Sequence, residues 1–551
     1  MISLDLCLSV SSFLLVLYFY FKKPNTGRQL PFPPGPKGWP VIGNVLDIPT
    51  EFEWEMYREW CKKFGTDVLH VPVMGTDIIV LDSSEAVMEL MERRSSIYSD
   101  RRPCSLNYLL KILVLTVSGD DGRWTGEMTF VVGFLPYGAS SFARLCELVW
   151  NNAALRRKHR RLMYQLLHPT AATQFHPHEI KATHNLLQRF LDEPENVMEN
   201  LRYMAGETIM SVAYGLPIKQ KDDVYIQLAE VGINALQAAS VPGASLVDLI
   251  PWLKYVPEWM PGAGFKRKAR EWDVLARRMV DLPFADAQKR TAEGCSTPSF
   301  TSISMQRVDD GTRDEAYQEH VVRGSAGTLY AAGTDTTVSA IASCILGLLE
   351  NPEIIRKAQA KFDSVIKPGH LPDFTDEKNL SFITALTMES LRWRDVVPIA
   401  IPRYLQVDDE YKGYKLPKGS IVIPNAWAML HDENVYSDPF VFNPERLLTK
   451  DGKINKAVRD PRHACFGFGR RICPRRYMAF SAVWIALASI LYCFDIEKEK
   501  DEDGNIIELC HEYQSSIVIQ PKPFKCSIKP RSERHPRAIR SVIIEHEFKT
   551  N

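Results

Sequence analysis

Cys473 stands in a sequence context that can turn a thiol into a metal ligand or a nucleophile. It ends the stretch FGFGRRIC, which begins at Phe466, and Pro474 follows it where a helical pattern starts. Proline suits the first turn of a helix, so the sulfur is expected among the free backbone amides of a helix N-terminus, which lower the pKa of a thiol. Taken alone, such a cysteine is more often a buried apolar residue. Both interpretations stay open at this point.

The segment GSAGTLYAAGTDTT, from Gly324 to Thr337, is a candidate for the other half of a reactive site. Its small residues would let a flat, wide group approach a helix backbone. A threonine hydroxyl can bond to the carbonyl four residues earlier and open room for a ligand, and for Thr336 that carbonyl belongs to Ala332. Asp335 beside it could relay protons. The alternative is a simple crossing of two helices with capped polar residues.

Two further groups of charges are candidates for fixed interactions. Glu389 and Arg392, in ESLR, lie three residues apart on one face of a predicted helix, and Arg446 in NPER offers a second guanidinium. Most such pairs are exposed and contribute little to stability, but this one stands among apolar residues. A carboxylate between two guanidiniums would be a structural clamp and not a catalyst. The basic run RRKHRR, residues 156–161, is predicted to bind an anionic group.

The bulk composition excludes some functional classes. The 551 residues hold 67 basic and 67 acidic side chains, so the chain lacks the positive field of a nucleic-acid binder, and no nucleic-acid partner is predicted. Its eleven cysteines are scattered, odd in number and without a CxxC pair. This pattern favours a reducing compartment over a disulfide framework or a zinc site.

The N-terminal residues predict a membrane anchor. Residues 1–21 form an apolar run about long enough for a membrane helix, and two lysines follow it. The positive-inside rule then places the body of the protein on the cytoplasmic side, with a cleaved signal peptide as the alternative. Residues 22–44 are predicted to be a basic, proline-rich hinge, and residues 531–551 a basic, solvated tail.

Residues 45–530 are predicted to form one domain of mainly α fold with small β-sheets. Helical patterns fill residues 180–215, 225–240, 266–292, 315–350, 352–366, 376–394 and 476–492. Residues 65–82 alternate as a hairpin does, and a second group of short strands is expected between 400 and 425. No internal repeat and no second domain boundary is found.

The motifs AAGTDTT, ESLR, NPER and FGFGRRIC follow one another in the order and approximate spacing of the cytochrome P450 family. The chain resembles this family over nearly its whole length, and fungal membrane-bound members most closely. The resemblance implies a cytochrome P450 fold, with haem b between the long oxygen-side helix and the helix after the cysteine loop. It makes Cys473 the axial iron ligand, whose thiolate favours O–O cleavage.

The resemblance also assigns roles to other residues by position. Asp335 and Thr336 match the acid and alcohol that deliver protons during oxygen activation, whereas the Glu389 group matches the family's structural clamp. The remaining residues expected to contact the haem are Arg157, His159, Arg403, Phe466, Gly469 and Arg471. Phe466 is expected to pack near the sulfur, and Arg403 and Arg471 to reach the haem propionates.

The resemblance implies a monooxygenase that inserts one atom of O2 into a lipophilic small molecule, in secondary metabolism. NADPH-cytochrome P450 reductase would supply the electrons, with cytochrome b5 as a second candidate donor. A single-pass anchor in the endoplasmic reticulum membrane would leave the catalytic domain cytosolic. One alternative is a haem-thiolate isomerase or dehydratase, which would not need the proton relay of Asp335 and Thr336. The other is an inactive, haem-poor relic or a faulty gene model.

Two departures from the family pattern support the last alternative. The family has glycine two residues after the ligand cysteine, where this chain has Arg475. That side chain is expected either to disturb the seating of the haem or to turn outward and join Arg470 and Arg476. Arg156 replaces a family tryptophan, and residues 104–155 are atypical. We interpret these residues as translated intron or another gene-model fault, which sequencing of the spliced transcript would test.

Overall fold

The computed structural model describes residues 30–49, 51–100, 153–240, 256–257, 259–260, 264–295, 297–307 and 315–550. The predicted anchor at residues 1–21 and nearly all of the atypical segment 104–155 lie outside the described residues. Contacts divide the chain into two compact units. Unit 1 combines described residues up to 100 with Ile399–Met429 and Phe468–Arg471, and unit 2 contains the other described residues. A boundary of this kind escapes sequence inspection because unit 1 is built from three separate segments.

The described residues confirm a mainly α fold with small β-sheets. The α-helices are α2 (Glu53–Phe64), α3 (Ser84–Val87), α6 (Ala153–Leu167), α7 (Pro169–Ala172), α8 (His176–Asp192), α9 (Val197–Tyr214), α10 (Val224–Ser240), α12 (Gly264–Ala292), α13 (Phe300–Met305), α14 (Glu315–Glu350), α15 (Pro352–Val365), α16 (Ser381–Trp393), α17 (Ala426–Leu430), α18 (Arg462–Cys465), α19 (Arg476–Cys493) and α20 (Arg534–Thr550). The strands are β1 (Val68–Val73), β2 (Thr76–Leu81), β3 (Arg403–Tyr404), β4 (Asp409–Tyr411), β5 (Tyr414–Leu416), β6 (Ile421–Pro424), β7 (Phe494–Lys498), β8 (Tyr513–Gln514), β9 (Gln520–Pro521) and β10 (Cys526–Pro530).

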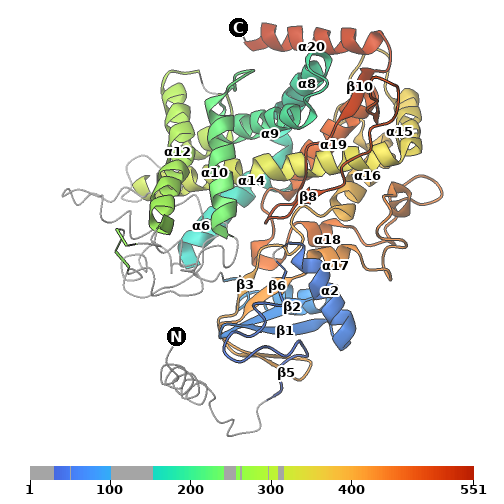
Figure 1. Ribbon diagram of the computed structural model, residues 1–551. Coiled ribbons are helices and arrows are strands. Elements are labelled where there is room, and N and C mark those ends of the chain that lie inside the picture. The colour runs from blue at the N-terminus through green and yellow to red at the C-terminus, as the bar shows by residue number, and fades with distance from the viewer. Residues whose placement is uncertain are drawn as a thin grey trace, which may run out of the picture. The chain divides into compact units, whose positions relative to one another are not determined.

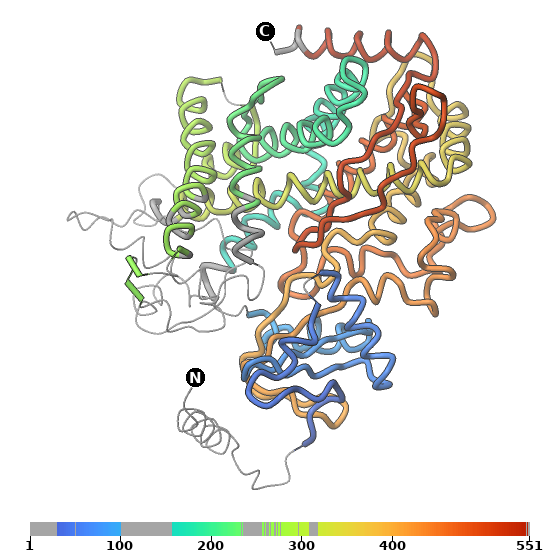
Figure 2. Tube along the Cα trace, in the orientation of Figure 1, coloured from blue at the N-terminus to red at the C-terminus, as the bar shows by residue number. Residues whose placement is uncertain are grey.

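Unit 1 is organised around a four-stranded sheet of order β1-β2-β6-β3. β1 and β2 form the predicted antiparallel hairpin, and Gly75 in its turn has a φ of +75°, which glycine adopts at no steric cost. β6 joins β2 in parallel and pairs with β3 on its other side. Figure 2 shows the blue trace of the β1–β2 hairpin beside the orange trace of β6. This sheet fixes the position of Arg403, the first residue of β3.

Helix α14 forms the centre of unit 2. Its 36 residues contain no proline, and it contacts α9, α12, α16 and α19 (Figure 1). It is apolar on nearly every side, as expected for a helix surrounded by others. The side chain of Asn351 donates to the carbonyl of Gly347 over 2.7 Å, and Pro352 starts α15. The helix therefore ends as the sequence predicts.

Two predicted elements of unit 2 differ from the structure. The helical pattern at 180–215 is divided into α8 and α9 around Pro194, because proline disfavours helical backbone in the residue before it. The C-terminal tail, expected to be solvated, is helix α20, which packs along α8 (Figure 1). Ile539 is fully buried there, and His546 contacts His184 of α8 over 3.0 Å. Arg534, Arg537 and Arg540 are exposed as expected, but the same helix also carries apolar residues such as Ile539 that pack inward.

Two helices among the described residues are long and apolar enough to cross a membrane, Gln318–Glu350 and Arg476–Cys493. In each, the apolar part is mostly buried inside unit 2, at 83% and 78% of the most apolar window. Core helices of a folded domain have the same properties, so these two are weak indicators of membrane insertion.

Candidate active site

One stripe of α14 is left uncovered in the middle of unit 2. Most residues of α14 near the middle of the helix are buried, but Thr328, Ala331, Ala332, Asp335 and Thr336 are partly or fully accessible. Their spacing of three and four residues places them on one face of the helix. The stripe is smooth at its alanines and polar at its end. It leaves room for a flat group against the helix backbone.

The polar end of the stripe has the predicted geometry. The hydroxyl of Thr336 donates to the carbonyl of Ala332 over 2.8 Å, which confirms the predicted bond to the residue four positions earlier. Burial raises the pKa of Asp335, while the positive charge of Arg202 and a hydrogen bond from Gln520 oppose this effect. A carboxyl with a raised pKa beside an accessible hydroxyl is suited to holding and passing on a proton.

The cysteine loop closes on itself just before α19. The backbone amide of Cys473 donates to the carbonyl of Phe466 over 2.8 Å, and Gly467 adopts a φ of +69° within the loop. Both side chains are partly accessible. Burial raises the pKa of the Cys473 thiol, and the charge and backbone amide of Arg475 oppose it most strongly. Burial thus outweighs the expected lowering of the thiol pKa by the helix N-terminus. A bound metal ion would favour loss of the thiol proton.

Arg475 does not turn outward. It lies at the N-cap of α19 with 6% of its surface exposed. Its guanidinium Nη2 donates to Thr337 Oγ1 over 3.1 Å and to the carbonyl of Gly333 over 3.3 Å, both on α14. The alternative in which Arg475 turns outward to join Arg470 and Arg476 is therefore wrong. Gly333 and Thr337 lie on the buried side of α14, so the side chain does not occupy the open stripe.

The basic helix α6 places its cations in different surroundings. Arg157 is exposed. His159 is buried, and its Nδ1 lies 2.9 Å from Ser325 Oγ on α14. Burial, and to a lesser extent the charge of His320, lower the pKa of His159 to about 4. Arg160, which the sequence pattern did not single out, donates to the carbonyl of Ile472 over 2.8 Å and thus reaches the cysteine loop.

Three of the predicted haem contacts belong to unit 1. Arg403 Nη2 donates to the carbonyl of Phe468 over 2.8 Å, and Arg471 Nε donates to the carbonyl of Ser99 over 2.8 Å. Gly469 has a φ of +52°, and a Cβ there would lie 2.1 Å from the carbonyl oxygen of Met91. Only glycine fits this position without a shift of the backbone.

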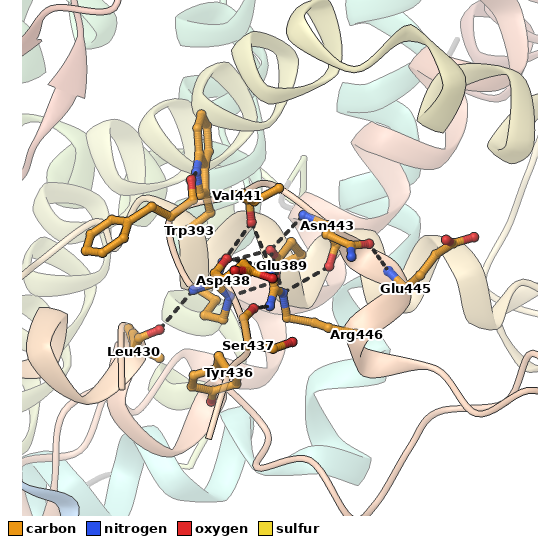
Figure 3. Close-up of polar contacts among 12 residues, drawn as sticks. Glu389, Trp393, Leu430, Tyr436, Ser437, Asp438, Val441, Asn443, Glu445 and Arg446 are labelled. Carbon is orange, nitrogen blue, oxygen red and sulfur yellow. Dashed lines mark hydrogen bonds and ion pairs between the residues drawn. The ribbon is translucent and has the colours of Figure 1, made fainter. Parts of the chain in front are cut away.

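The three residues of the predicted clamp are brought together in unit 2, and Figure 3 shows Glu389 beside Arg446. Arg392 holds both carboxylate oxygens of Glu389, over 2.7 and 2.8 Å, and Arg446 Nε donates to Oε1 over 3.2 Å. Glu389 and Arg392 are fully buried. The remaining guanidinium hydrogens reach backbone carbonyls, among them those of Leu430 and Val441. The clamp thus joins α16 to residues 430–446, which contain both of these carbonyls and Arg446.

The residues around the open stripe fit a haem. A haem needs one axial protein ligand and a flat, uncrowded space for the porphyrin. Cys473 offers a partly accessible sulfur, and two residues later Arg475 contacts α14, which bears the stripe. The alanines of the stripe leave the helix backbone approachable. The arrangement therefore supplies a sulfur ligand, a flat surface and a proton-holding pair within one unit.

Comparison with known proteins agrees with this geometry. A family model described as Cytochrome P450 matches residues 137–528. The chain belongs to the cytochrome P450 family. It is 40% identical to cytochrome P450 monooxygenase 98 of Postia placenta over 549 residues, covering 99% of this chain and 98% of that protein. It is 38% identical to cytochrome P450 monooxygenase ple1 of Rhodocybe pseudopiperita (92% and 91% covered) and 36% identical to tryptamine 4-monooxygenase of Psilocybe cyanescens (95% and 97% covered).

Membership of the cytochrome P450 family confirms the predicted fold, the haem cofactor and the monooxygenase activity. The isomerase and dehydratase alternative is not favoured, and neither is the inactive relic. The sequence pattern singled out the segments that contain Gly333, Thr337 and Arg160, but it did not predict their contacts with Arg475 and the cysteine loop. It missed Glu179, which carried no signal.

Proposed function

We propose that this cytochrome P450 oxidises a lipophilic small molecule bound against the open stripe of α14. The observation that carries the proposal is the uncovered face from Thr328 to Thr336, because the other residues of α14 between 324 and 349 are buried. Apolar walls with a few polar groups at one end are typical of sites for small organic ligands. The alanines would face the substrate, and the polar end of the stripe would face the reacting atoms.

Cys473 would hold the haem iron, and the bound haem would supply oxygen activation, favoured by the electron-donating thiolate. Phe466 would pack beside the sulfur. Predicted contacts to the rest of the haem are Arg157, His159, Arg403, Gly469 and Arg471. Arg160 joins them as a support of the cysteine loop, because it bonds the residue directly before Cys473.

Asp335 and Thr336 would move protons at this site. The Thr336 hydroxyl is anchored on the Ala332 carbonyl, so its oxygen is held at a fixed position on the stripe and can accept a proton from Asp335 or a water. Because burial raises the pKa of Asp335, the carboxyl holds its proton to a higher pH than an exposed aspartate. The clamp of Glu389, Arg392 and Arg446 would support the fold without touching the reacting atoms.

The proposed redox partner is the one that the family resemblance implies, and the proposed location depends on the N-terminal residues. Electrons would come from NADPH through cytochrome P450 reductase, with cytochrome b5 as a second donor. Residues 1–21 would anchor the protein in the endoplasmic reticulum membrane with the catalytic part cytosolic. A role in secondary metabolism is part of the same proposal.

The test begins with expression in yeast microsomes and the carbon monoxide difference spectrum of the dithionite-reduced protein. A red-shifted thiolate band is expected, and its loss in Cys473→Ser is the control. Turnover with NADPH and reductase against a panel of lipophilic compounds follows. Tryptamine belongs in the panel because one relative is named for it. Protein on a blot without a thiolate band would refute the proposal.

A further inference from the structure

Arg475 is a buried cation two residues after the cysteine ligand. Arg475 is 6% exposed, and its backbone amide and its charge both act to lower the pKa of the Cys473 thiol. One guanidinium nitrogen holds the Gly333 carbonyl and the Thr337 hydroxyl of α14. The same Gly333 carbonyl also accepts from Thr337 Oγ1 over 3.0 Å. Arg475 is therefore tied to the cysteine loop by its backbone and to α14 by its side chain.

The space for this side chain exists because residue 333 is glycine. A Cβ at Gly333 would lie 2.1 Å from Arg475 Nη1 and 2.8 Å from a side-chain carbon of Ile209. Heavy atoms cannot approach to 2.1 Å without a bond. The guanidinium thus fills the volume directly above the glycine backbone, which holds the charge in one position.

A buried carboxyl on α8, that of Glu179, acts on the charge of this cation. Glu179 is 1% exposed, and its Oε1 accepts from Ser481 Oγ over 3.0 Å. Among the described residues, its Oε2 accepts no hydrogen bond. Burial raises the pKa of Glu179 to about 8, and the charge of Arg475 opposes the rise. Conversely, burial lowers the pKa of Arg475, and the charges of Cys473 and Glu179 oppose that. The two side chains therefore act on each other's charge.

Among the charges that act on the Cys473 sulfur, Arg475 is the strongest, ahead of Arg160 and Arg476. In a buried site a cation interacts with a nearby anion far more strongly than in water. Reduction of an iron centre adds one negative charge, so a neighbouring cation stabilises the reduced state more than the oxidised one. Charge and hydrogen bonds around the axial ligand are the means by which a protein sets such a potential.

We propose that Arg475 is a positioning residue that holds a fixed positive charge beside the Cys473 sulfur and thereby raises the reduction potential of the haem iron. Gly333 provides the room, Thr337 fixes the orientation, and Glu179 partly offsets the charge. The inference rests on the proposed function in one respect, that Cys473 ligates the haem. It replaces the expectation that an arginine here simply disturbs the cofactor.

The experiment is potentiometric titration of purified holoenzyme, full chain, in four forms. Arg475→Met keeps an unbranched apolar stem but removes the charged guanidinium, and a shift of the midpoint potential to more negative values is expected. Arg475→Lys keeps the charge and should stay closer to wild type. Glu179 is ionised only above a pH of about 8, so the titrations are run above that pH. There Glu179→Gln removes the opposing charge while keeping an oxygen for Ser481, and a shift to more positive values is expected. A purely structural role would not give shifts of opposite sign.

The outcomes separate this inference from the proposed function. Thiolate bands in all forms with equal potentials, or with shifts of the same sign in Arg475→Met and Glu179→Gln, would overturn the inference alone. A thiolate band that appears only when Arg475 is replaced by glycine would overturn it too, because the cation would then exclude the haem. Absence of the band from wild type and all variants would overturn both. If Arg475→Met does not accumulate, the sign of the Glu179→Gln shift decides.

Discussion

The guanidinium of Arg475 occupies the volume that any side chain at residue 333 would need, since a Cβ on Gly333 would lie 2.1 Å from Nη1. The two residues are 142 positions apart and belong to α14 and the start of α19. The glycine expected after the ligand cysteine is thus replaced by a large residue whose side chain rests on another glycine. Arg475, which departs from the family pattern, is therefore accommodated in the packed interior of unit 2.

Gly333→Ala should destabilise the protein because of this contact. Overpacking of a core costs about 1–3 kcal/mol, and the contact with Ile209 adds to the strain. In the Arg475→Gly background most of that cost should disappear, which a thermal or urea unfolding cycle on the four forms would measure. Gly264→Ala is the matched control, since its Cβ would meet nothing closer than 4.0 Å. Equal costs of Gly333→Ala with and without Arg475 would contradict the packing described.

Glu389→Gln should be among the most destabilising single changes in unit 2. It would leave Arg392 and Arg446 without their shared carboxylate in a fully buried position, which costs roughly 3–5 kcal/mol. Glu445→Gln is the matched control, because the pair of Glu445 with Lys357 is about half exposed (53% and 50%) and exposed pairs contribute roughly 0–1 kcal/mol. Urea unfolding of both variants gives the comparison. Similar midpoints for the two would show that the clamp is not a stabilising unit.

The sequence was most informative where local pattern decides the structure. Helices α10, α14, α15 and α19 lie within about two residues of their predicted bounds, because apolar periodicity and flanking prolines determine them. The clamp was predictable in the same way, since Glu389 and Arg392 share one helix face. Cys473 and Thr336 were found from small motifs with fixed spacing.

The remaining features depend on contacts between distant segments. The direction of Arg475 follows from Gly333, and the charge of this cation is influenced by Glu179 of a third helix. Neither relationship can be predicted from the residues that neighbour Arg475 in the sequence. The packing of α20 on α8 is of the same kind, since the composition of residues 531–551 suggests a solvated tail. The raised pKa of Cys473 likewise reflects burial, which the N-terminal position in a helix does not reveal.

Thr336→Ala should lower the yield of product per NADPH oxidised, because it removes the hydroxyl at the accessible end of the stripe. The loss expected for a proton-transfer group is on the order of 100-fold or more in the chemical step, with Thr336→Ser closer to wild type. Thr328→Ala is the matched control. Thr328 lies on the same stripe, and its hydroxyl makes the same bond to the residue four positions earlier, Gly324, over 2.7 Å. Equal losses in Thr336→Ala and Thr328→Ala would show a general effect of the helix and not a proton relay.

Glu179 should make the stability of the protein fall as the pH rises. Its pKa is about 8 in the folded protein and 4.5 for an ordinary glutamate, so the folded state binds this proton more tightly than the unfolded state. The stabilising contribution is complete below pH 4.5 and is lost progressively as the pH rises to about 8, by at most about 5 kcal/mol. Glu179→Gln should flatten the free energy of unfolding over this window, measured by urea titrations at several pH values. Glu445→Gln, on the surface, should leave the slope unchanged. A slope in Glu179→Gln equal to that of wild type would place the proton-binding group elsewhere.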